Sequence, residues 1–167
     1  ARVVRTSGPA GARDVDDACS VRGLADGWEL AVHIADVSHY VKPDTAIDHE
    51  ARKRGNSTYL VDRVLPMLPE QLSNGICSLV PGEDRLTRCA VMHFDRKGTM
   101  VRSRFEQAII RSHCRLTYDD AQTVLDAGGE ETGVVLNEIE ALLNECWALA
   151  GVLRRRRFSE GALDLDF

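Results

Sequence analysis

Residues 28–37 read Trp-Glu-Leu-Ala-Val-His-Ile-Ala-Asp-Val and carry the clearest secondary-structure signal in the 167-residue chain. Their largest apolar residues, Trp28, Leu30, Val32 and Ile34, fall at every second position. A period of two places side chains on one face of a β-strand. The stretch therefore predicts a strand whose large apolar side chains share a single face.

Hairpin signals lie on both sides of this strand. Upstream, residues 18–21 and the turn-forming residues 23–27 predict an antiparallel hairpin with it. Downstream, residues 89–94 and 100–110 flank the turn sequence Asp-Arg-Lys-Gly at 95–98. The sequence thus predicts a second hairpin and a mainly antiparallel sheet.

The region between the hairpins predicts a short helix and no central strand. Asp44-Thr45 resembles a helix N-cap and Gly55 a C-cap, which together predict a helix over about 45–54. Two prolines within residues 59–69 exclude a regular central strand there.

The last third of the chain has a helical pattern. Thr117 and Asp120 resemble a capping box, and Gly128-Gly129 ends the helix that they begin. A longer helix is predicted over about 134–157. Its expected buried face contains Leu136, Ile139, Leu143, Cys146, Ala150 and Leu153. Strands followed by helices predict an α+β fold, a twisted sheet and then packed helices.

Composition limits the class of protein. The chain is 44% hydrophobic and 28% charged, which is typical of a globular domain of this length. No apolar run approaches the roughly 18 residues of a membrane span, and the N-terminus lacks the apolar core of a signal peptide. We therefore expect no membrane association. Five scattered cysteines indicate reduced thiols and a cytoplasmic protein. A first residue other than Met suggests a fragment, and nothing in the sequence indicates an obligate protein partner.

Charge leaves a nucleic-acid partner open. The net charge of −5 argues against a surface that is basic throughout, but a binding channel needs only local positive charge. Only three of the 21 basic residues are lysines. This excess of arginine reflects either genome composition or phosphate binding, for which the guanidinium group offers two parallel donors.

The most informative polar stretch contains Asp14, Asp16 and Asp17. Three carboxylates within four residues repel one another unless a cation is present. Hard oxygen ligands suit Mg²⁺ or Mn²⁺, which bind one or two carboxylates together with phosphate oxygens. From the spacing alone a solvated acidic loop is the favoured interpretation, and a metal site is the alternative.

Residues 12–18, Ala-Arg-Asp-Val-Asp-Asp-Ala, resemble the acidic signature of the RNB-domain family, which includes ribonuclease II, ribonuclease R and Dis3-like enzymes. Further blocks resemble the same family in the same order and cover nearly the whole chain. They are residues 32–38, 50–59, 65–69, 72–79, 115–118 and 161–164. The resemblance is closest to the ribonuclease R branch.

The resemblance implies a function. Residues 1–167 would form the N-terminal half of an RNB catalytic domain that degrades single-stranded RNA from 3′ to 5′ and releases nucleoside 5′-monophosphates. Asp14, Asp16 and Asp17 would be the catalytic residues and the ligands of Mg²⁺, or of Mn²⁺. Tyr59 matches a tyrosine that stacks near the 3′-terminal base, and a half-buried strand tyrosine is the alternative. Arg154–Arg157 are interpreted as helix-end charge, with RNA backbone contact as the alternative.

Two positions depart from the family pattern. The first signature Asp falls on Gly8 and another upstream Asp falls on Gly11, so one metal-binding carboxylate is missing. Three hypotheses follow: part of a metal-dependent exoribonuclease, an impaired RNA-binding relative, or an α+β interaction module whose acidic loop is surface. The matching blocks disfavour the third.

Overall fold

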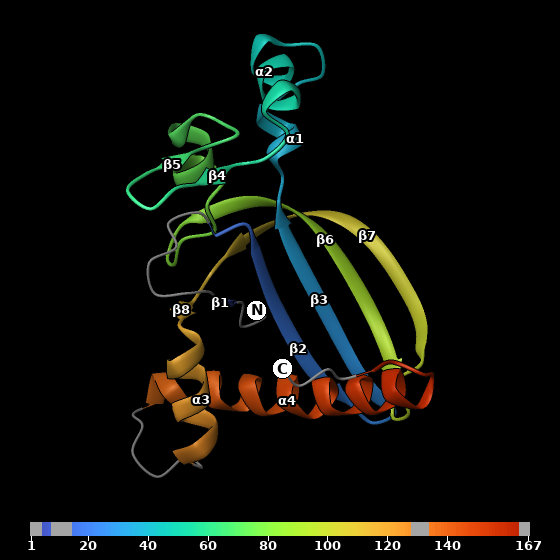
Figure 1. The fold of residues 1–167 in the computed structure, drawn as a ribbon. Coiled ribbons are helices and arrows are strands. Elements are labelled where there is room, and N and C mark those ends of the chain that lie inside the picture. The colour runs from blue at the N-terminus through green and yellow to red at the C-terminus, as the bar shows by residue number, and fades with distance from the viewer. Residues whose placement is uncertain (1–4, 8–14, 128–133, 164–167) are drawn as a thin grey trace.

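The computed structural model describes residues 5–7, 15–127 and 134–163 (Figure 1). The chain has an α+β fold, as predicted, built on a six-stranded sheet in the order β7-β6-β3-β2-β1-β8. Neighbouring strands pair antiparallel except β1 and β8, which are parallel. The strands are β1 Arg5–Ser7, β2 Asp17–Leu24, β3 Gly27–Ala35, β6 Asp84–Asp95, β7 Met100–Arg111 and β8 Cys114–Leu116.

Both predicted hairpins are confirmed. In the first, β2 pairs with β3 from Asp17 opposite Ile34 to Leu24 opposite Gly27. Its turn is therefore tighter than predicted, with two residues, 25–26, between the strands. The second hairpin joins β6 and β7 around residues 96–99.

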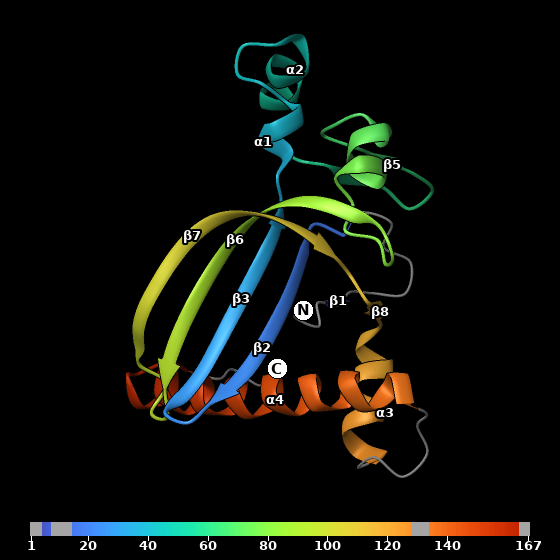
Figure 2. The same cartoon turned by 180° about the vertical axis from the view of Figure 1, so that it is seen from behind.

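A smaller lobe extends beyond the end of β3 (Figures 1 and 2). It contains the helices α1 Val37–Tyr40 and α2 Ala46–Arg54, the two-stranded sheet of β4 Thr58–Tyr59 and β5 Val64–Leu65, and the π-helical segment η1 Gln71–Ile76. The predicted caps of α2 are confirmed: Thr45 accepts a hydrogen bond from the Asp48 N–H, and Gly55 ends the helix with a φ of 76°. The proline-rich segment lies outside the main sheet, as expected.

The two faces of β3 differ in burial. Glu29, Ala31 and His33 are buried, whereas the larger Leu30 and Val32 on the other face are half-buried. The alternation thus predicted the strand correctly, but the face with the largest apolar side chains is the less covered one. Burial depends on what packs against a face as well as on the hydrophobicity of its residues.

The predicted C-terminal helices are α3 Tyr118–Ala127 and α4 Val134–Ser159. The capping box at α3 is confirmed, since the Asp120 N–H donates to Thr117 Oγ1 and the Thr117 N–H donates to Asp120 Oδ2, each at 3.0 Å. Ile139 and Leu143 of α4 pack with Leu116 of β8 in one hydrophobic cluster.

The predicted buried face of α4 was only partly correct. Leu142 and Leu149, which were not expected there, are buried, whereas Ala150 is exposed. The side chain of Leu136 lies outside the described residues. The buried side chains of α4 are those that α3, β8 and β2 cover. The periodicity of the helix alone does not show which side these elements occupy.

Helix α4 lies across the hairpin ends of the sheet strands (Figures 1 and 2). Trp28 Nε1 donates to Glu145 Oε2 at 2.9 Å, and Arg156 Nη1 donates to the Gly98 carbonyl at 2.9 Å. Gly98 has a φ of 79°, and a Cβ there would lie 2.9 Å from Val152 Cγ1. Glycine at this turn therefore permits the close approach of the helix.

Candidate functional site

Two of the three predicted acidic residues lie at one end of the sheet, where β2 begins and β3 ends. The Ala35 N–H donates to the Asp16 carbonyl at 2.9 Å, and Asp17 lies opposite Ile34 in the strand register. Both Asp16 and Asp17 are exposed to solvent. Their backbone is therefore fixed by the sheet while their carboxylates remain accessible to a ligand.

Val15 anchors the acidic segment from the other side. Its side chain is buried in a cluster with Ala18, Ala35, Cys77, Leu79 and Ile110. Its N–H donates to Ser78 Oγ at 3.1 Å, and its carbonyl accepts from the Leu79 N–H at 2.8 Å. One apolar residue among the carboxylates thus attaches the segment to the loop at 77–79.

Asp14, Gly8 and Gly11 lie outside the described residues. The described part of the chain contains no group of three or more His, Cys, Asp or Glu side chains placed to hold a metal. Since the predicted set needs Asp14 as its third member, the convergence of Asp14, Asp16 and Asp17 stays a prediction. The two described carboxylates fit a hard cation in chemistry, because they are exposed oxygen donors on adjacent residues.

The negative charge of Asp16 acts on the loop that holds Val15. Burial, followed by the nearby Asp16 carboxylate, raises the pKa of the Cys77 thiol. Cys77 therefore stays a protonated packing residue at neutral pH.

Asp36 is a buried carboxylate beside the site that the sequence interpretation did not select. Its Oδ2 lies 3.1 Å from Arg88 Nε, and Ser38 Oγ donates to its Oδ1. The Ser38 hydrogen bond, and then Arg88, hold the pKa of Asp36 below its usual value against the opposing effect of burial. An Asp directly after a strongly alternating strand was the available signal.

Tyr59 lies in β4, in the lobe beyond the sheet. It pairs with Val64 of β5 and is 66% exposed. The alternative of a half-buried tyrosine is therefore wrong. The neighbouring Leu60 and Val61 are also exposed, which makes this hairpin an apolar projection available to a stacking or apolar partner.

The arginines at the end of α4 have local partners. Arg156 contacts Glu160 at 2.7 Å as well as the Gly98 carbonyl, and the Arg154 guanidinium lies 5.5 Å from the centre of the Phe158 ring. These contacts support the interpretation of the cluster as helix-end charge.

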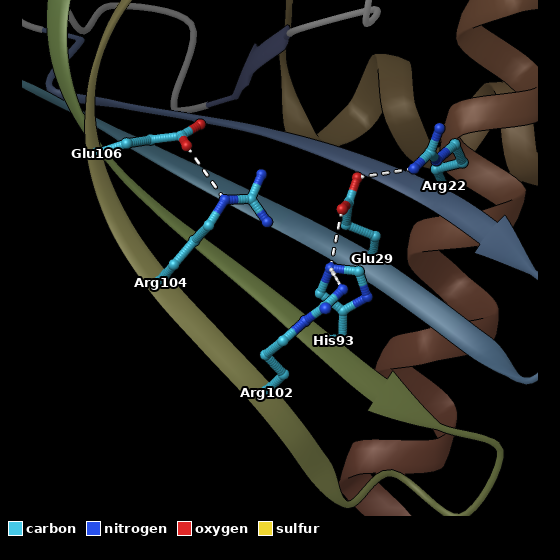
Figure 3. A network of polar contacts seen from close by, with 6 residues as sticks. All are labelled: Arg22, Glu29, His93, Arg102, Arg104 and Glu106. Atoms are coloured by element: carbon cyan, nitrogen blue, oxygen red, sulfur yellow. Dashed lines mark hydrogen bonds and ion pairs between the residues drawn. The ribbon is translucent and has the colours of Figure 1, made fainter.

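Polar contacts occupy the face of the sheet that carries Glu29, Ala31 and His33 of β3 (Figure 3). The Glu29 carboxylate is 5% exposed and contacts Arg22 Nη2 at 3.2 Å and His93 Nε2 at 2.9 Å. Arg102 lies 3.2 Å from the same His93 nitrogen, and Arg104 pairs with Glu106 at 3.1 Å. On this face of the sheet, ion pairs cover small buried residues such as Ala31 and Cys89.

The structure is similar to that of a ribonuclease. It matches "Mycoplasma genitalium RNase R in complex with ribose methylated single-stranded RNA" with a TM-score of 0.92 and 33% identity, over 99% of this chain and 26% of that one. Ribonuclease R of Thermotoga maritima is 45% identical over 99% of this chain and 23% of its own length. A family model for the RNB domain matches residues 3–167. The chain therefore belongs to the RNB domain family.

The matched relatives are longer than this chain, and they include a protein named as inactive. The chain spans about a fifth of the length of the curated ribonuclease R relatives that it matches. Another relative, 39% identical over 98% of this chain, is named "Inactive exonuclease DIS3L2" of Arabidopsis thaliana. Membership in the family therefore includes inactive proteins. In the part of the chain that the structure describes, no helix is both long and apolar enough to span a membrane.

Proposed function

We propose that residues 1–167 are the N-terminal half of the catalytic domain of a 3′-to-5′ exoribonuclease. The substrate is single-stranded RNA and the products are nucleoside 5′-monophosphates. The observation that carries the proposal is the RNB match over residues 3–167. Within it, Asp16 and Asp17 lie at the start of β2, where Val15 is anchored to Ser78. The sequence has five scattered cysteines and no Cys-x-x-Cys pair, which agrees with a cytoplasmic enzyme.

Asp14, Asp16 and Asp17 would hold Mg²⁺, or Mn²⁺ in its place. The bound ion would supply activation of water and stabilisation of charge on the scissile phosphate. The protein's own contribution is positional. Burial of Val15 and the Ala35–Asp16 backbone bond fix the segment, so that the backbone of Asp16 and Asp17 does not have to be ordered when RNA binds.

Tyr59 would stack on a base near the 3′ end of the RNA. Its ring is accessible, and it lies on a hairpin separate from the main sheet. Stacking contributes about 1–3 kcal/mol per base and tolerates any base, which suits an enzyme that acts on RNA of any sequence.

A second candidate function is RNA binding without efficient hydrolysis. Gly8 replaces the first signature Asp, and a glycine cannot ligate a metal. The inactive relative supports this alternative at the level of the family.

The test uses the longer protein that contains this chain. Asp16→Asn and Asp17→Asn should each weaken Mg²⁺ binding, measured by calorimetry without RNA, and reduce mononucleotide release from poly(A). Asp26→Asn is the control, because Asp26 is an exposed carboxylate in the turn between β2 and β3, at the opposite end of these strands. Unchanged metal binding and release in both site variants would reject the assignment of these carboxylates. If the unmodified protein binds poly(A) but releases no mononucleotide, the second function is correct, and Gly8→Asp should then restore release.

A further inference from the structure

Arg88 is an exposed cation on the sheet face that carries Asp17. Directly opposite residues in antiparallel strands share a face of the sheet. The registers across β2, β3, β6 and β7 place in one row Asp17, Ile34, Arg88 and Gln107. The Arg88 side chain is 58% exposed. A positive charge that can contact a ligand therefore lies in the same row as one carboxylate of the candidate site.

Arg88 is held by the buried carboxylate of Asp36. The Asp36 side chain is 4% exposed, and its Oδ2 lies 3.1 Å from Arg88 Nε. Ser38 Oγ and the Gln107 side chain also donate to this carboxylate, which stays ionised at neutral pH. The Asp36 backbone is fixed as well, because its N–H donates to the Leu86 carbonyl at 2.9 Å. The guanidinium group is therefore anchored to the fold through Nε, while the side chain stays largely open to solvent.

The end of β3 connects this anchor to the acidic segment. The Ala35 N–H donates to the Asp16 carbonyl at 2.9 Å, and the next residue, Asp36, bonds to β6. Neighbouring strands lie about 4.8 Å apart, so the backbones of Asp17 and Arg88, two strands apart, are separated by about 10 Å. Arg88 therefore lies at a fixed position beside the carboxylates and not among them.

The surface next to Arg88 has room for a ligand. Ile34, which lies between Asp17 and Arg88 in the row, is 45% exposed. A hollow of about 260 Å³ adjoins the ion pair, and its lining includes Asp36, His39, Leu86, Gln107 and Ile109. The part of the sheet between the acidic segment and Arg88 is therefore accessible.

A phosphate ligand at this end of the sheet needs a cation. Asp16 and Asp17 are exposed carboxylates, which repel a phosphodiester wherever no metal ion bridges the two. A guanidinium group offers parallel N–H donors that match the oxygens of a phosphate. At about 10 Å from Asp17, these donors suit a phosphate that neighbours the one at the acidic segment.

We propose that Arg88 binds a backbone phosphate of the RNA next to the phosphate at the acidic segment, and that Asp36 is the positioning residue that holds the guanidinium group there. This rests on the proposed function, which makes RNA the substrate. The ion pair then has two roles, because it satisfies a buried carboxylate and fixes a cation for the ligand.

The first test measures RNA affinity without hydrolysis, in the longer protein that contains this chain. Arg88→Gln should weaken the binding of a short oligo(A) in EDTA several-fold. It should also lower the slope of log Kd against log salt concentration by about 0.7, which corresponds to one lost phosphate contact on a single strand. Arg88→Lys keeps the charge and should keep the slope, with lower affinity because an ammonium group lacks the two parallel donors. An unchanged slope in Arg88→Gln would overturn the proposal.

Arg22 is the matched control, because it forms the same kind of pair elsewhere. It is 62% exposed and lies 3.2 Å from the carboxylate of Glu29, which is 5% exposed, on the other face of the sheet (Figure 3). Arg22→Gln should therefore lower Tm about as much as Arg88→Gln and leave the salt slope unchanged. Equal losses of affinity in the two variants would show a general effect of charge or stability, which would overturn the phosphate contact.

Asp36→Asn tests the positioning role. The substitution removes a negative charge near the RNA, which by itself would strengthen binding, so weaker binding identifies a loss of position. In the double variant with Arg88→Gln, Asp36→Asn should cause no further loss, because the residue acts through Arg88. Additive losses, or tighter binding by Asp36→Asn alone, would overturn the positioning role.

Kinetics separate this proposal from the proposed function. With Mg²⁺, Arg88→Gln should raise KM for oligo(A) and leave kcat within about twofold, because the contact is the same in the bound substrate and in the transition state. If the unmodified protein releases no mononucleotide but the salt slope depends on Arg88, the proposed function fails and the phosphate contact stands. If release is rapid and neither the slope nor KM depends on Arg88, the function stands and the contact fails.

Discussion

Val15 is the residue on which the geometry of the acidic segment depends. It is buried directly before the exposed Asp16, and its N–H and carbonyl are bonded to Ser78 and Leu79. A carboxylate cluster repels itself and does not hold its own backbone in place. The attachment of the site to the fold therefore comes from an apolar side chain and two backbone groups.

Ser78→Ala should test this attachment. The substitution leaves the buried Val15 N–H without its hydroxyl acceptor, which should lower the free energy of unfolding by about 1–3 kcal/mol. Denaturant unfolding measures the change. Ser159→Ala, which removes an exposed hydrogen bond to the Arg156 carbonyl, should change stability by less than about 0.5 kcal/mol. Equal effects of the two variants would show that the anchor contributes nothing specific.

Asp36 should make stability depend on pH in acid. Because its pKa in the folded protein is lowered, its contribution is complete above the unfolded value of about 3.9 and is lost as pH falls through the folded pKa. Asp36→Asn should therefore be less stable than the unmodified chain at pH 7, and the difference should shrink below about pH 4. Urea unfolding from pH 3 to 7 measures this. The control Asp62→Asn alters an exposed pair and should show little difference at any pH.

At the scale of elements, local signals were sufficient where the interactions are local. The caps of α2, the capping box of α3 and both hairpins were predicted because residues a few positions apart form them. The pairing of β1 with β8 was not predicted. These three-residue strands lie about a hundred positions apart, and such short segments carry no periodicity.

For the candidate site, the residue types at 14–17 left a solvated loop and a metal site open. The family resemblance predicted the metal-binding roles, and these stay predictions. Sequence alone did not indicate the anchor at Ser78 or the ion pair of the buried Asp36 with the exposed Arg88. Both depend on strands and loops that approach one another only in the folded sheet.

Helix α4 should contribute to the free energy of unfolding mainly through its buried side chains, such as Leu143. Leu143→Ala should lower the free energy of unfolding by about 2–5 kcal/mol, because Leu143 is 2% exposed and packs with Leu116 and Ile139. Trp147→Ala, one turn later on the same helix, removes a larger side chain that is 65% exposed. We expect a change of about 0.5 kcal/mol or less there. Thermal or urea unfolding distinguishes the two, and a greater loss at Trp147 would contradict the packing described.

At the scale of the whole molecule, we expect the 167-residue chain alone to release little or no mononucleotide from single-stranded RNA. It spans about a fifth of its ribonuclease R relatives, and Gly8 supplies no carboxylate. The measurement is mononucleotide release from poly(A) with Mg²⁺, with EDTA added in a parallel sample. Rapid release that EDTA abolishes would show that this chain contains a complete catalytic centre.

The position of β1 in the sheet has a consequence for folding during synthesis. β1 precedes the acidic segment, yet one of its two neighbours is β8 at residues 114–116. Val15, within that segment, bonds to residues 78 and 79. Closing contacts of such high sequence separation is slow, and neither can form before the later residues have left the ribosome. A nascent or truncated chain that ends before residue 116 would therefore lack both of these attachments, and the backbone around Asp16 and Asp17 would not yet be fixed.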